Sequence, residues 1–159
     1  MTNPRTSSAL KKSRLATETK FEFEIASVTF EKHQMKSIFK RMLGILLFEK
    51  IDEVEITFGF AWGNEVYESE WLPIKTSSSR IEEMVEAQSQ KGIGSIGSDD
   101  FLIDIHDKAI RILFCHECDI HIEYSSESGL LENLKSVIRP EEWAWGKSKG
   151  QAEWEKLIP

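Results

Sequence analysis

Alternation of apolar and polar residues in three consecutive segments is the feature that most constrains the fold. The segments are Phe101–His106, Ala109–Phe114 and Asp119–Tyr124, and short turn sequences join them. Successive side chains of a strand point to opposite faces of a sheet, so this pattern predicts three strands that each have one apolar face. Because the connections are only a few residues long, we expect an antiparallel meander.

The apolar faces also fix how the three strands pair, since a slip of one residue would turn every side chain over. The expected pairs are Ile105 with Ile110, Ile103 with Ile112, Ile112 with Ile122, and Ile110 with Tyr124. On the opposite face this register predicts two rows: Asp104, Arg111 and Glu123, and Leu102, Leu113 and His121. Cross-strand ion pairs contribute roughly 0.2–1 kcal/mol each. We therefore interpret the charged row as a device that sets the register.

The remaining segments predict three further strands and four helices. Alternation over residues 21–30 shifts by one position, which predicts a strand with a bulge or an early end. Residues 54–72 predict a hairpin that turns at Gly63-Asn64. Apolar residues at helical spacing predict helices over about 31–50, 79–90, 130–138 and 143–157. The second begins at a capping box, Ser79 to Glu82, and stops at Gly92.

Runs of antiparallel strands, without strict alternation of strand and helix, predict an α+β protein. We expect a single, mainly antiparallel sheet with helices packed on one face. The chain of 159 residues fits one such domain, which we place at residues 20–159. Residues 1–19 mix Ser, Thr, Lys and Arg without periodicity and predict a flexible basic tail.

Charge is segregated along the chain, whose formal net charge is −7. Residues 1–20 hold five basic groups and one acid, a net charge of +4, which leaves 15 basic and 26 acidic groups, a net charge of −11, on residues 21–159. An acidic surface repels nucleic acid and anionic lipid and attracts basic partners. The longest apolar run, residues 42–48, is far short of the roughly 20 residues that span a bilayer. Two cysteines are too few for a disulfide-stapled secreted scaffold. We expect a cytoplasmic protein that binds neither nucleic acid nor membrane.

A glycine pattern over residues 92–97 has the spacing of a dinucleotide-binding fingerprint. That fingerprint follows a strand and opens a helix, whereas this one follows a predicted helix and precedes a predicted strand. We interpret it as a helix stop and a loop, and we expect no cofactor.

The segment from Cys115 to His121 is the densest cluster of reactive side chains. Cys115, Cys118 and His121 could supply three zinc ligands with water as the fourth, and the predicted register puts Cys115 and His121 diagonally on one face. No second Cys or His pair follows to close a structural site. We favour a turn with reduced thiols. A metal-stabilised module, or a zinc-assisted hydrolase with Glu117 as general base, is the alternative.

The segment Phe114-Cys-His-Glu-Cys-Asp-Ile-His-Ile122, with Asp100–Asp104 before it, resembles a Phe-Cys-His-Glu-x-Asp-Ile-His pattern. That pattern occurs in small bacterial immunity proteins of polymorphic-toxin systems, including those of contact-dependent growth inhibition. The resemblance covers about residues 100–124 and implies a protein that binds and blocks a cognate toxin, with no catalytic residues. The pattern usually has a polar residue at the position of Cys118, which weakens the zinc alternative.

Charge and resemblance together predict a non-enzymatic inhibitor that neutralises a cognate basic toxin, with a nuclease as the expected class. Acidic groups would steer association and an aromatic side chain would anchor it. The predicted contacts are Asp99, Asp100, Asp104, Asp119, Glu123 and Trp143. Another hypothesis is a non-catalytic subunit of a larger assembly that docks through the last, Trp-bearing helix. The sequence leaves the oligomeric state open.

Overall fold

One antiparallel sheet, in the order β3-β2-β4-β5-β6-β1-β7-β8, organises the protein. The computed structural model describes residues 21–59, 62, 72–92, 94–150 and 153–158, so the predicted tail at 1–19 lies outside the described residues. The strands are β1 Phe23–Ser27, β2 Val54–Phe58, β3 Ile74–Thr76, β4 Phe101–Ile105, β5 Ile110–Phe114, β6 Ile120–Tyr124, β7 Trp143–Ser148 and β8 Glu155–Lys156. The α-helices are α2 Lys32–Phe48, α4 Ile81–Lys91 and α5 Gly129–Lys135. Short 3-10 helices are η1 Ser78–Arg80, η2 His106–Lys108 and η3 Pro140–Glu142.

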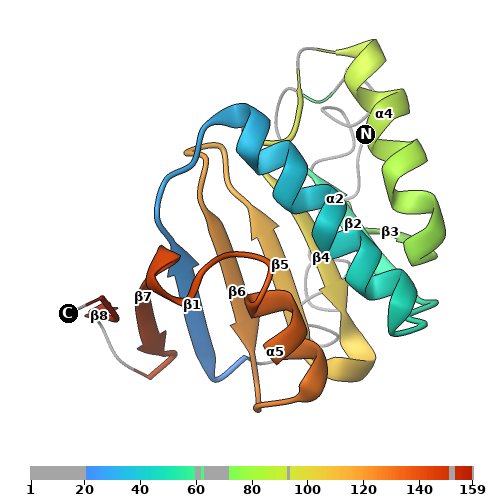
Figure 1. Ribbon diagram of the computed structural model, residues 1–159. Coiled ribbons are helices and arrows are strands. Elements are labelled where there is room, and N and C mark those ends of the chain that lie inside the picture. The colour runs from blue at the N-terminus through green and yellow to red at the C-terminus, as the bar shows by residue number, and fades with distance from the viewer. Residues whose placement is uncertain (1–20, 60–61, 63–71, 93, 151–152, 159) are drawn as a thin grey trace, which may run out of the picture.

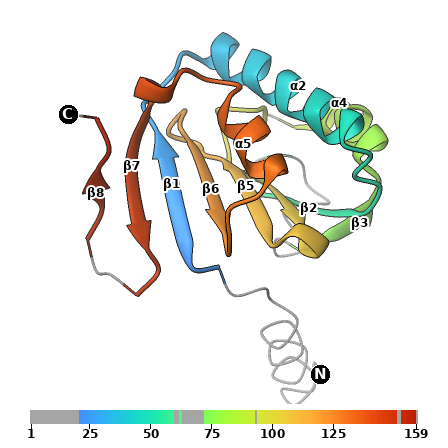
Figure 2. The same ribbon diagram turned by 60° about the horizontal axis from the view of Figure 1, so that its bottom comes forward.

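The α-helices cover one face of the sheet, which confirms the predicted α+β class (Figures 1 and 2). Helix α2 buries the apolar stripe that predicted it, and the ring of Phe39 meets the rings of Phe101 and Phe114 edge-on at 5.8 and 5.2 Å. Edge-to-face pairs of this kind add to the burial of apolar area. The core therefore lies between the helices and the apolar face of the strands. Among the described residues, no α-helix covers the other face of the sheet (Figure 2).

The meander of β4, β5 and β6 has the predicted register throughout. Ile105 pairs with Ile110, and Ile112 lies between Ile103 and Ile122. The charged row on the opposite face forms as well, because Arg111 lies between Asp104 and Glu123. The predicted bulge in the first strand is a register shift between Ala26 and Ser27 where β1 pairs with β7.

The predicted last helix is wrong, because its first part is a strand. Trp143–Ser148 forms β7 against β1, and Glu155–Lys156 forms β8 against β7. Pairing with β1 gives the backbone a partner, whereas Gly146 and Gly150 would destabilise a helix by roughly 1 kcal/mol each. The docking helix that the subunit hypothesis requires is therefore not present at Trp143–Ser148.

The predicted start of the second helix also needs correction. Ser79 does not cap α4; the chain enters that helix through η1, and the Ser78 hydroxyl donates to the carbonyl of Ile51 instead. This side chain satisfies a buried carbonyl in the loop after α2. Strand β2 pairs with β3, and the turn and the second arm of the predicted hairpin, at residues 63–71, lie outside the described residues.

Candidate functional site

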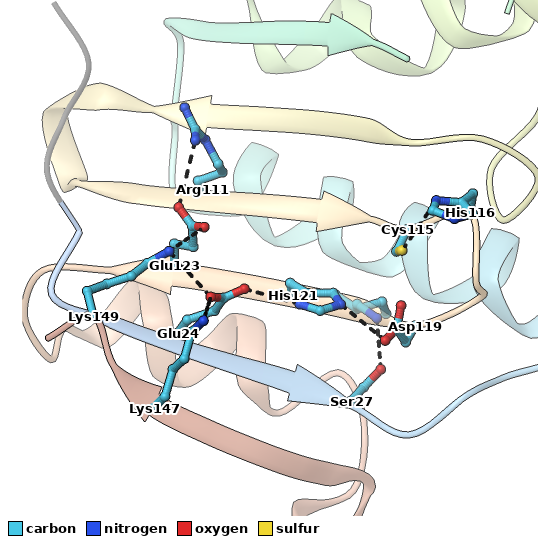
Figure 3. A network of polar contacts seen from close by, with 11 residues as sticks. Glu24, Ser27, Arg111, Cys115, His116, Asp119, His121, Glu123, Lys147 and Lys149 are labelled. Atoms are coloured by element: carbon cyan, nitrogen blue, oxygen red, sulfur yellow. Dashed lines mark hydrogen bonds and ion pairs between the residues drawn. The ribbon is translucent and has the colours of Figure 1, made fainter. Parts of the chain in front are cut away.

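A chain of ion pairs crosses the helix-free face of the sheet, and we call it the polar network (Figure 3). Arg111 lies 2.5 Å from Asp104 and 3.7 Å from Glu123. Lys149 then connects Glu123, at 2.8 Å, to Glu24 on β1, at 3.3 Å. Asp104 and Glu24 are only 6% and 8% exposed. An unpaired buried carboxylate destabilises a folded protein, so Arg111 and Lys149 stabilise this face by pairing with Asp104 and Glu24.

His121 on β6 continues the network between two carboxylates. Its Nδ1 lies 3.2 Å from Glu24 Oε1, and its Nε2 lies 3.1 Å from Asp119 Oδ2. Burial lowers the pKa of His121, but hydrogen bonds with Asp119, Cys115 and Glu24 outweigh it and raise that pKa to about 11. Burial also raises the pKa of Glu24 and of Asp119, yet the hydrogen bond to His121 leaves both lowered. The ring is therefore an imidazolium held between two carboxylates.

The turn between β5 and β6 positions these groups. The Cys115 N–H donates to the Asp119 carbonyl at 2.9 Å, and the Cys118 N–H donates to the Cys115 carbonyl at 3.1 Å. Cys118 has a φ of 63°, the left-handed conformation that ends such a three-residue hairpin turn with a bulge. As a result Cys115 lies opposite Asp119, and His121 follows two residues later on the same face.

A second cluster shares Cys115 and lies on the turn itself. The backbone N–H and the ring Nδ1 of His116 each lie 2.9 Å from Asp100 Oδ1, and Nδ1 is also 3.7 Å from Cys115 Sγ. The hydrogen bond with Asp100 raises the pKa of His116, whose side chain is 56% exposed.

The structure separates the cysteines that we considered together as zinc ligands. Both are free thiols, and the Cys118 thiol donates to the Gly97 carbonyl at 3.2 Å. In the described part of the chain, two groups place candidate ligand atoms within 4.8 Å of one another: Asp100, Cys115 and His116, and Cys115, Asp119 and His121. Neither group contains Cys118.

Internal contacts engage all the residues that we predicted to bind a partner: Asp99, Asp100, Asp104, Asp119, Glu123 and Trp143. Asp99 accepts the backbone N–H of Asp100 at 2.7 Å. Trp143 is 5% exposed, and its Nε1 donates to the carbonyl of Lys135 at 2.9 Å. A partner that binds these groups would have to share them with contacts that the protein already makes.

A different acidic surface lies where α2 ends and β2 begins, and we call it the acidic end. It comprises Phe48, Asp52, Glu53 and Asp107. Phe48 is 83% exposed, and the three acids are exposed too. Among the described residues none forms an ion pair with these acids. The acids line a hollow of about 620 Å³, and Lys75 and His106 line it too. Phe48 lies outside the buried apolar stripe of α2. Its position relative to that stripe could have indicated from the sequence that its side chain is exposed.

Another hollow, of about 810 Å³, lies between α2 and the α5–η3 segment. Both acids of its lining are paired within the chain: Lys135 is 3.4 Å from Glu132, and Arg139 is 3.3 Å from Glu142. Arg41 lines this hollow too. The acidic end therefore has unpaired carboxylates, whereas the carboxylates of this hollow are paired.

Comparison of the chain with models of known protein families, with curated proteins and with solved structures finds no match. Within the described ranges, no helix combines the length and the apolar composition that crossing a membrane requires.

Proposed function

We propose that the protein is an inhibitor that binds and neutralises a basic protein, with the acidic end as its contact surface. The observation that carries the proposal is a set of three exposed carboxylates, Asp52, Glu53 and Asp107, that form no ion pair with a described residue. Phe48, which is 83% exposed, ends α2 four residues before Asp52. Interfaces commonly combine an aromatic anchor with charged surroundings. The anchor supplies affinity, and the charges steer the encounter.

The acids of the polar network serve this role less well. Glu123 already has Arg111 and Lys149, and Asp104 has Arg111. A lysine or arginine of a partner would have to displace one of these cations and would gain little in exchange. The carboxylates at the acidic end can accept a partner's cations without such a loss.

A cognate toxin of the nuclease class is the partner that this chemistry suits. A nuclease binds phosphates through Lys and Arg, so its active surface attracts an acidic protein. The net charge of −11 on residues 21–159 and the resemblance of residues 100–124 to immunity proteins support the same partner. Two free thiols fit a reducing compartment, so we place the inhibition in the cytoplasm.

The test is binding of the purified chain to the toxin domain encoded by the gene immediately upstream, measured by calorimetry at several salt concentrations. We expect a 1:1 complex whose affinity falls as salt rises. The variant D52K/E53K/D107K should lose binding, and E82K/E83K/E86K, which reverses three exposed acids of α4, should retain most of it. Equal losses would show that only net charge matters. An affinity that does not depend on salt concentration, or the absence of binding, would contradict the proposal.

A further inference from the structure

We propose that Cys115, Asp119 and His121 form a zinc-binding site at the turn between β5 and β6. This inference is independent of the proposed inhibitor function. It differs from the ligand set considered from the sequence, because Asp119 replaces Cys118.

The three donors have the chemistry and the spacing that Zn²⁺ requires. Zinc takes thiolate sulfur, imidazole nitrogen and carboxylate oxygen at about 2.0–2.3 Å in a tetrahedron, which puts neighbouring ligand atoms about 3.3–3.6 Å apart. Nε2 of His121 and Oδ2 of Asp119 are 3.1 Å apart, and all three donor atoms lie within 4.8 Å of one another. Small side-chain movements would therefore be enough to enclose the ion.

The backbone holds these donors in place without help from a metal. Cys115 and Asp119 are joined across the turn by the 2.9 Å hydrogen bond, and His121 is fixed two residues further along β6. A site built on paired strands loses little conformational freedom when an ion binds.

Glu24 supplies the outer partner that metal-bound histidines usually have. Its Oε1 lies 3.2 Å from Nδ1 of His121, which leaves Nε2 directed at Asp119 and available to a metal. Lys149 and Lys147, 3.3 and 3.6 Å from Glu24 Oε2, hold the carboxylate in turn (Figure 3).

A buried oxygen without a partner provides a second, independent observation. Oδ1 of Asp119 is buried and has no hydrogen-bond partner among the described residues. Buried polar atoms in native proteins are almost always satisfied, so this carboxylate oxygen, on the residue that contacts His121, has a lone pair available to a cation.

The neighbouring cluster of Asp100, Cys115 and His116 fits less well. The His116 side chain is 56% exposed, and its Nδ1 already contacts both Asp100 and Cys115. Zinc at the proposed site would displace the thiol proton of Cys115 and the Nε2 proton of His121, and water would complete the tetrahedron. The ion would thus tie β5 to β6 and, through Glu24, to β1.

The experiment titrates the metal-free full chain with Zn²⁺ by calorimetry and with Co²⁺ by absorption spectroscopy. We expect one ion per chain and a sulfur-to-cobalt charge-transfer band. Cys115→Ser should abolish the band and weaken Zn²⁺ binding by more than the about 10–100-fold that loss of an outer partner costs. Cys118→Ser is the matched control and should bind as the unaltered chain does. Glu24→Gln should weaken binding within the about 10–100-fold range.

Other outcomes would overturn the site. Equal losses in Cys115→Ser and Cys118→Ser would assign the ion to the two cysteines. A loss in His116→Ala without a loss in His121→Gln would assign it to the neighbouring cluster. If Cys115→Ser fails to fold, Asp119→Asn replaces it, and unchanged binding by that variant would refute the proposal. Absence of binding by the unaltered chain would refute it as well.

Discussion

The polar network and the acidic end hold similar side chains but differ in what those side chains do. In the network, Glu24, Asp104 and Glu123 each have at least one cation within 4 Å. At the acidic end, no cation of the described chain forms an ion pair with Asp52 or Asp107. The difference teaches that the number of acids in a sequence says little about how many are available to a partner. Carboxylates in the network pair with cations of the sheet, and those at the acidic end are the ones that we propose a partner contacts.

The largest expected effect is on the pH dependence of the free energy of unfolding, to which the polar network contributes. The measurement is made with a chelator present, so that the chain is metal-free. The raised pKa of His121 contributes stability that is complete below about pH 6.5 and is lost as pH rises towards about 11. The slope is up to about 1.4 kcal/mol per pH unit. The lowered pKa values of Glu24 and Asp119 contribute stability that is present above pH 4.5 and is lost as pH falls. Urea unfolding across this range measures both limbs.

His121→Gln is the control for that pH profile, because it keeps a polar side chain and removes the titrating ring. Its stability should no longer fall between pH 6.5 and 10 beyond the fall that other groups cause. A profile identical to that of the unaltered chain would mean that the imidazolium contributes nothing.

Removal of the cation at the centre of the charged row should destabilise the protein by about 3 kcal/mol, the lower end of the range for breaking a buried ion pair. Arg111→Ala leaves Asp104, which is 6% exposed, without its 2.5 Å partner. The free energy of unfolding from denaturant titration measures the loss. The double variant R111A/D104N should recover part of it, and no recovery would place the cost outside the ion pair.

Loss of the aromatic anchor should separate binding from stability. Phe48→Ala should weaken the complex with the toxin domain by about 2 kcal/mol, as truncation of a central aromatic does. Because Phe48 is 83% exposed, the unfolding free energy should change by less than about 0.5 kcal/mol. A loss of stability larger than the loss of affinity would place Phe48 among the packing residues.

The smallest expected effect is on the stability of variants at the acidic end. Asp52→Asn and Asp107→Asn should each alter the unfolding free energy by less than about 0.5 kcal/mol, because no cation of the described chain loses a partner. The same amide substitution at Asp104 should cost more. If all three cost the same, the distinction between the two regions disappears.

Predictions from the sequence succeeded where the pattern was local and repeated. The meander has the predicted register because each strand alternates with a period of two and each turn is short. The prediction of a helix from Trp143 failed because pairing with β1, more than a hundred residues away in the sequence, decides the conformation of this segment.

The site could be predicted only in part for the same reason. The register already put Cys115 and His121 on one face, as observed. Glu24 could not be placed beside His121, because the pairing of β1 with β6 joins distant parts of the chain. The acids predicted as contacts were chosen for their charge alone. The structure pairs Asp104 with Arg111 of β5, and Glu123 with Lys149, which follows β7.

One measurement tests the central claim most directly: the affinity of two charge-neutralised variants for the toxin domain, at low and moderate salt. The account predicts that D52N/E53Q/D107N binds much more weakly than the unaltered chain and with less dependence on salt. Glu123→Gln, in the polar network, should bind almost unchanged. Weakened binding by Glu123→Gln, together with unchanged binding by the triple variant, would contradict the account and place the interface on the helix-free face.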